Sequence, residues 1–107
     1  MTIREVSVDE LELALAAGGR VVDVRETAEY AEAHVAGATL VPLGTVPQQV
    51  DVFRGDGPVY VICRSGARSM RACEFLSDQG VEAVNVAGGM LAWASSGRAA
   101  VGGELPE

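Results

Sequence analysis

Short runs of β-branched and aliphatic residues alternate along the chain with short helical patterns, and this alternation limits the fold more than any other feature. The run at 59–62, Val-Tyr-Val-Ile, is the strongest and is typical of a strand buried on both faces. Further strands are expected at about 3–6, 21–24, 38–41 and 84–86. Strands separated by short helices favour an α/β fold, a three-layer α/β/α sandwich with a mainly parallel central sheet of about five strands.

Capping residues, prolines and glycines bound the helical patterns between these strands. Ser7 and Glu10 form a capping box that begins a helix ending at Gly18. Other helices are expected at about 27–33, 47–52, 68–79 and 90–94. The length suits one domain over residues 1–107, with a core at about 3–97 and a loosely held, Gly-rich tail over about 98–107.

The charge balance disfavours several classes of partner. The 107 residues include 15 acidic and 8 basic residues, all of the latter Arg, which gives a formal net charge of −7. This charge disfavours nucleic-acid binding and docking on anionic membranes, and no apolar run approaches the ~18 residues of a membrane span. The N-terminal residues show no apolar stretch of the signal-peptide type, so we expect a cytoplasmic protein. In that compartment the two cysteines are expected to be thiols rather than a disulfide.

The segment after the strongest strand holds the clearest chemical signal. It reads Cys-Arg-Ser-Gly-Ala-Arg-Ser over 63–69, and a helix is expected to begin within it. A tight turn between a strand and a helix directs backbone N–H groups inward, and the helix N-terminus adds partial positive charge. Gly66 allows the turn, while Arg64 and Arg68 add two full positive charges. These features favour a nucleophilic thiolate at Cys63.

The second cysteine and the single histidine receive other interpretations. Cys73 shares a helix face with Met70 and Leu76, so we expect it to fill the core, with a resolving thiol as the alternative. The two cysteines and His34 match no metal-binding spacing, so no metal site is expected. His34 could pair with Cys63, but a local hydrogen bond in its own loop is the favoured interpretation.

Four segments, in order, resemble the signatures of the rhodanese-like sulfurtransferase family. They are 22–26 with Glu29-Tyr30, 34–38 followed by Pro42, 63–69, and 86–90 with Ala92-Trp93. Together they cover about residues 3–97. The resemblance implies the rhodanese-like three-layer fold and the activity of a thiosulfate sulfurtransferase that needs no cofactor.

The resemblance also implies roles for individual residues. Cys63 would be the catalytic nucleophile that takes a sulfane sulfur from a donor such as thiosulfate, as a persulfide, and passes it to cyanide, a small thiol or a protein thiol. The residues that would bind the substrate in the active-site loop are Arg64, Ser65, Gly66, Ala67 and Arg68. Asp23 and Arg25 would support the site as a buried ion pair. Trp93 is expected to pack in the core.

Alternatives to this function remain open. The chain could be a sulfur-carrier or redox module that serves one dedicated partner protein, or a docking domain without activity. A phosphatase is disfavoured because only four residues separate Cys63 from Arg68, and the related cysteine phosphatases have five. Ile62 also stands directly before Cys63, where a phosphatase of this kind has His. The expected partners are a small anionic sulfur donor and a protein sulfur acceptor, and the chain is expected to be a monomer or a homodimer.

Overall fold

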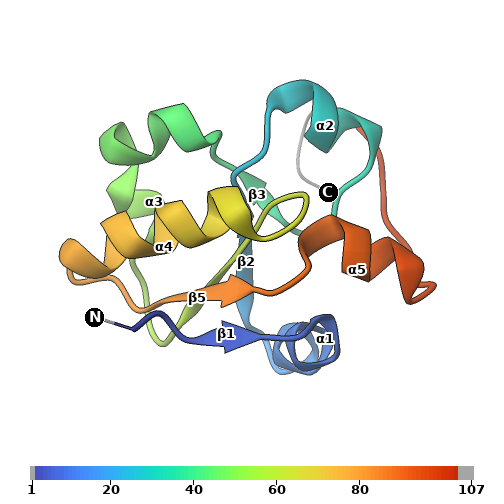
Figure 1. Cartoon of the computed structure of the whole chain (residues 1–107), viewed down its shortest axis with the longest axis horizontal. Helices are drawn as coiled ribbons and strands as arrows, with labels where there is room; N and C mark the ends of the chain where they lie inside the picture. The colour runs from blue at the N-terminus through green and yellow to red at the C-terminus, as the bar shows by residue number, and fades with distance from the viewer. Residues whose placement is uncertain (1, 104–107) are drawn as a thin grey trace.

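A five-stranded sheet with all strands parallel forms the centre of the computed structural model, which describes residues 2–103 (Figure 1). The strands are β1 (Glu5–Val6), β2 (Arg20–Asp23), β3 (Thr39–Leu40), β4 (Val59–Ile62) and β5 (Ala83–Val86). Their order across the sheet is β1-β5-β4-β2-β3, so the strongest predicted strand, β4, is the central one. The predicted α/β fold with a five-stranded parallel sheet is confirmed.

Helices cover both faces of this sheet. They are α1 (Val8–Ala16), α2 (Thr27–Glu32), the 3-10 helix η1 (Leu43–Gln48), α3 (Val50–Phe53), α4 (Ala67–Asp78) and α5 (Gly89–Ser95). In Figure 1, β1 and β5 run side by side, α4 lies above β5, and α1 lies to the right of β1. No helix within residues 2–103 has the length and apolar character needed to cross a bilayer.

The core is divided into two apolar clusters by the alternation of side chains along the strands. Tyr60 and Ile62 of β4 pack on one face with residues of α1 and α5. Val59 and Val61 pack on the opposite face with residues of α3 and α4. Successive side chains of a strand point to opposite faces, so a continuous apolar run such as β4 supplies both clusters. Cys63 belongs to the cluster that lies under α4.

The prediction of a helix at 47–52 is wrong in where the helix starts and in its type. The chain forms a 3-10 helix at Leu43–Gln48 and then a single α-helical turn at Val50–Phe53. The N–H and Oγ1 of Thr45 both donate to the carbonyl of Pro42 at 2.8 Å, which closes the first turn before the predicted start. The other elements lie where the sequence predicts them, with ends shifted by a residue or two.

The C-terminal segment makes backbone hydrogen bonds with the rest of the chain as far as residue 103. Val101 and His34 exchange two backbone hydrogen bonds, at 2.8 and 2.9 Å, in an isolated antiparallel bridge. The N–H of Gly103 donates to the carbonyl of Ala31 at 2.8 Å. These bonds use backbone groups only, so the composition of the tail does not reveal them. Residues 104–107 of the predicted tail lie outside the described residues.

Candidate active site

The loop that holds Cys63 leaves the carboxyl end of the central strand and leads directly into α4. Gly66 is the N-cap of α4 and has a φ of +108°, a left-handed conformation that favours glycine. The buried side chain of Asn85, on the neighbouring strand β5, donates to the carbonyl of Gly66 at 3.2 Å and to Glu5 Oε2 at 2.8 Å. The turn predicted at Gly66 is therefore confirmed, and an asparagine from the next strand fixes it.

A second glycine brings the start of α5 against the same loop. The N–H groups of Met90 and Leu91 donate to the carbonyls of Cys63 at 2.9 Å and of Arg64 at 3.0 Å. Gly89 has a φ of +54°, and a Cβ on it would lie 2.3 Å from the Cys63 carbonyl oxygen. The contact between α5 and the loop therefore requires glycine at this position.

The Cys63 thiol is buried, with 1% relative exposure, and its Sγ accepts two hydrogen bonds. The N–H of Gly66 donates at 3.1 Å and the hydroxyl of Ser69 at 3.3 Å. Burial raises the pKa of Cys63, but hydrogen bonds from the Ser69 hydroxyl and from the backbone N–H groups of Ser69, Gly66 and Ser65 outweigh it, so the pKa is lowered. A thiol with a lowered pKa supplies more of the thiolate, which is the nucleophilic form.

The remaining loop residues divide between the surface and a contact with α2. Arg64, Ser65 and Ala67 are exposed, whereas Arg68 is half-buried. The Arg68 guanidinium donates to both carboxylate oxygens of Glu29, at 2.8 and 2.9 Å. Arg68 therefore ties the first turn of α4 to α2.

A groove runs beside this loop and reaches the start of α5. It has a volume of about 390 Å³, and its lining residues are Arg25, Glu29, Glu32, Ala33, Arg64, Met90 and Leu91. The Arg64 and Glu29 side chains thus share one open space at the carboxyl edge of the sheet. In parallel α/β sheets ligands bind at this edge.

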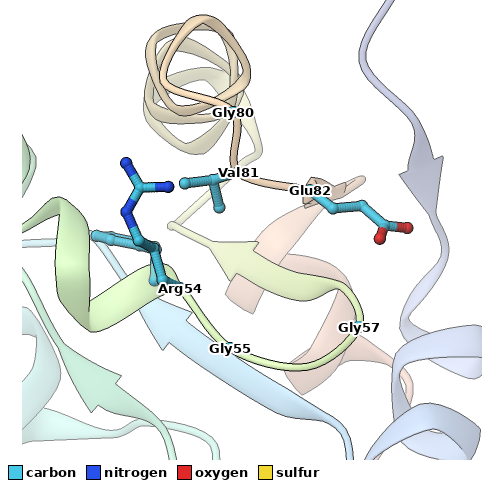
Figure 2. A pocket seen from close by; sticks show the side chains of 7 residues that line it. Arg54, Gly55, Gly57, Gly80, Val81 and Glu82 are labelled. Carbon is cyan, nitrogen blue, oxygen red and sulfur yellow. The ribbon is translucent and has the colours of Figure 1, made fainter.

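Another pocket lies at the opposite edge of the sheet, where β4 and β5 begin (Figure 2). Its volume is about 280 Å³, and Figure 2 shows Arg54 facing Val81 across it. The guanidinium of Arg54 donates to the Gln79 carbonyl at 3.1 Å and pairs with Asp51 at 3.4 Å. This arginine is engaged with the surrounding chain, and the pocket lies at the sheet edge remote from Cys63.

The ion pair predicted at the end of β2 is present and buried. Arg25 Nη2 lies 2.7 Å from Asp23 Oδ2, with side-chain exposures of 7% and 0%. The same Nη2 donates to the carbonyl of Ala33 at 2.7 Å, which connects the strand to the end of α2. The pair therefore holds Arg25, which lines the groove, against the end of α2.

The other candidate residues, Cys73 and His34, lie outside the Cys63 loop and make structural contacts. Cys73 is fully buried in the core, and burial, followed by the charges of Cys63, Glu5 and Glu74, raises its pKa to about 12. The ring of His34 stacks on that of Tyr30, and its Nδ1 lies 2.7 Å from the Tyr30 carbonyl oxygen. These placements confirm the expected core position of Cys73 and the expected local contact of His34.

Trp93 is also buried, as the sequence predicts. Its Nε1 donates to the carbonyl of Ala99 at 2.9 Å. Within residues 2–103, no group of three or more His, Cys, Asp or Glu side chains is placed to hold a metal ion.

Comparison with known proteins places the loop and the fold in one family. The model of the rhodanese-like domain matches residues 7–96, most of the chain and all of the site. The chain belongs to the rhodanese-like domain family. It is 40% identical over 77 residues to a sulfurtransferase of Allochromatium vinosum, covering 71% of this chain and 72% of that protein.

Two further members of the family show the extent of the similarity. The chain is 31% identical over 94 residues to the thiosulfate sulfurtransferase GlpE of Pseudomonas entomophila, covering 87% of this chain and 86% of that protein. A crystal structure of a rhodanese-related protein from Thermoplasma volcanium superimposes with a TM-score of 0.85 at 32% identity, covering 92% of this chain and 97% of that one. The rhodanese-like fold therefore extends over nearly the whole chain.

Three residues of this rhodanese-like site make contacts that the sequence does not predict. Ser69 closes the loop motif, and its position one residue after Arg68 in a first helical turn is the signal that could have indicated a contact with Cys63. Glu29 was assigned only to a family signature, and no local pattern shows that it meets Arg68, 39 residues away. Asn85 is a polar residue inside a predicted buried strand, which indicates a buried hydrogen bond but not its partner.

Proposed function

We propose that this rhodanese-like protein is a sulfurtransferase that moves a sulfane sulfur from thiosulfate, or a similar anionic donor, to a thiophilic acceptor through a persulfide on Cys63. The observation that carries the proposal is the Cys63 thiol, whose pKa is lowered by hydrogen bonds from Ser69, Gly66 and Ser65. The similarity to a protein named thiosulfate sulfurtransferase supports thiosulfate as the donor to test first.

The proposed reaction has two displacements. The Cys63 thiolate attacks the outer sulfur of thiosulfate, a new S–S bond forms, and the bond between the outer and inner sulfurs breaks. Sulfite leaves with the electron pair of the broken bond, and Cys63 carries a persulfide anion. An acceptor thiolate or cyanide then attacks the outer persulfide sulfur and takes it, and the Cys63 thiolate is regenerated.

The loop suits both displacements because it stabilises negative charge on sulfur. The N–H of Gly66 and the hydroxyl of Ser69 already donate to Sγ, at 3.1 and 3.3 Å. A persulfide anion places its charge one atom further out, and preorganised donors around that position lower the energy of the intermediate. Arg64, exposed at the rim, supplies positive charge for an anionic donor. The cysteine itself carries the sulfur, so this mechanism requires no cofactor.

Thiosulfate loading followed by intact-mass measurement tests the proposal. Treatment with thiosulfate, in the absence of an acceptor, is expected to add one sulfur atom to the wild-type chain. The addition should disappear in Cys63→Ala and persist in Cys73→Ala, because only Cys63 lies in the loop. A folded wild-type chain whose mass does not change would overturn the proposal.

A panel of acceptors then identifies the second half-reaction. We expect the loaded protein to lose its sulfur to cyanide and to small thiols. Loading that is followed by transfer to one protein thiol alone would instead indicate a sulfur-carrier module. We also propose that the chain works in the cytoplasm, as a monomer or a homodimer.

A further inference from the structure

The guanidinium of Arg68 already holds an anion, the carboxylate of Glu29. Nη1 lies 2.8 Å from Oε1 and Nη2 lies 2.9 Å from Oε2, so the contact has two parallel hydrogen bonds. A guanidinium binds carboxylates and other oxyanions with this same two-pronged geometry. An oxyanion that bound to Arg68 would therefore use the same groups that Glu29 occupies.

The pair lies at the edge of the groove beside the Cys63 loop. Glu29 lines the groove beside the loop, together with Arg64. Arg68 directly precedes Ser69, whose hydroxyl donates to Cys63 Sγ at 3.3 Å. Each side chain of the pair retains 31% exposure, so water and small solutes reach the contact. The pair is thus accessible to solutes, and after the hydrogen bond to Glu29 the charge of Cys63 is among the influences that raise the pKa of Arg68.

Glu29 is also held in position from its own helix. Its Oε1 accepts a hydrogen bond from the N–H of Glu26 at 2.9 Å, in the capping box of α2. The hydrogen bond from Arg68 has the largest influence on the pKa of Glu29. Partial burial is the next influence and raises this pKa, but the hydrogen bonds from Arg68 and from the Glu26 N–H outweigh burial and lower the pKa to about 2. The carboxylate therefore stays charged at any pH at which a cysteine nucleophile would work.

We propose that Glu29 is a specificity-determining residue that competes, as an internal counterion, with anionic substrates for the guanidinium of Arg68. An anionic donor binds by taking the place of the Glu29 carboxylate on Arg68, whereas a neutral reagent reaches Cys63 without this exchange. Glu29 thereby weakens the preference of the site for anions. The assignment of thiosulfate as the competing anion depends on the proposed sulfurtransferase function, but the competition itself does not.

A matched pair of alkylating reagents tests the competition independently of sulfur transfer. Iodoacetate and iodoacetamide both react by attack of the Cys63 thiolate on a methylene carbon, with iodide leaving, and they differ in that only iodoacetate is an anion. The rate of each reaction is followed by intact mass, with Cys63→Ser as the blank. The ratio of the iodoacetate rate to the iodoacetamide rate then reports the preference of the site for anions.

Glu29→Gln removes the charge of Glu29, while its amide oxygen can still accept from the Glu26 N–H. We expect it to raise the rate ratio by about fivefold, the factor that corresponds to one partly exposed ion pair. Glu32→Gln removes the same charge from the same groove, and we expect a rise smaller than about twofold from long-range charge alone. Glu10→Gln alters the equivalent capping box of α1, remote from the loop, and should leave the ratio unchanged.

Competition between Glu29 and an anion for Arg68 also predicts how Glu29→Gln changes the loading with thiosulfate. The KM for thiosulfate loading should fall in Glu29→Gln by about the same factor as the alkylation ratio rises. If Glu29→Gln does not fold, as judged by circular dichroism, Glu29→Asp replaces it, because the shorter side chain cannot keep both hydrogen bonds to Arg68. An unchanged or lower ratio in the folded variant, or an equal rise in Glu32→Gln, overturns the inference. A wild-type chain that is alkylated but takes no sulfur from thiosulfate overturns the proposed function instead, and the ratio still tests Glu29.

Discussion

Gly89→Ala tests whether the close approach of α5 shapes the Cys63 loop. The added Cβ would lie 2.3 Å from the Cys63 carbonyl oxygen and 2.7 Å from both the carbon and the oxygen of the Arg64 carbonyl. All three are backbone atoms, so no side chain can rotate away to relieve the overlap. The start of α5 must move, and the hydrogen bonds from Met90 and Leu91, at 2.9 and 3.0 Å, are then lost or lengthened.

The cost can be worked out from these contacts. Alanine in the left-handed conformation of Gly89 costs about 1–2 kcal/mol. Two weakened backbone hydrogen bonds add about 1 kcal/mol each, which gives a loss of about 3–4 kcal/mol in the free energy of unfolding. This is a large part of the ~5–15 kcal/mol that stabilises a typical domain.

The matched control for this variant lies at the other end of the same helix. Gly97 also has a positive φ, +81°, but a Cβ on it would meet nothing within 4 Å. Gly97→Ala should therefore cost only the conformational part, about 1–2 kcal/mol. Urea unfolding measures both variants, and the rate of thiosulfate loading should fall in Gly89→Ala alone. Equal losses of stability in the two variants, with equal loading rates, would refute the role given to Gly89.

Four other tests concern the remaining parts of the site. Ser69→Ala removes a hydrogen-bond donor to the thiolate, so the pKa of Cys63 should rise and alkylation at neutral pH should slow. A pH–rate profile of alkylation measures this pKa, and an unchanged profile would contradict the Ser69 hydrogen bond as a cause of the lowered pKa. The wild-type rate should increase with pH through a pKa below that of an ordinary thiol, because the thiolate form predominates above the pKa. Asp23→Asn leaves the guanidinium of Arg25 buried without its counterion and should cost about 3–5 kcal/mol in urea unfolding, whereas a loss under about 1 kcal/mol would contradict the buried pair. Cys73 has a pKa near 12 and lies in the core outside the loop, so it should react with iodoacetamide only after unfolding in urea; modification of the folded chain at both cysteines would contradict this.

The strands and the Cys63 loop could be predicted because their signals are local. The run at 59–62 is apolar on both faces, and it became the central strand. Gly66 and the residues around it indicated a turn between a strand and a helix, and that turn places N–H groups against the sulfur. Arginine charge was expected to act on the thiol as well, but hydrogen bonds provide the leading contributions that lower its pKa.

The contacts that complete the site join segments distant in the sequence, and these could not be predicted. Glu29 and Arg68 lie 39 residues apart, and their pairing depends on how α2 and α4 are placed on the sheet. The bridge between Val101 and His34 could not be predicted for a related reason, because it is made by backbone groups that every sequence contains. Local patterns report which elements form, whereas side-chain partners across the sheet depend on the packed fold.

The mass of the chain after incubation with thiosulfate tests the central claim most directly. Peptide mapping of the treated wild-type protein should place one added sulfur on the peptide that contains Cys63 and none on a peptide that contains only Cys73. Addition of cyanide should then return the mass of the chain to its starting value. A folded protein that gains no sulfur, or that gains it at Cys73, would contradict the assignment of Cys63 as the sulfur-carrying nucleophile.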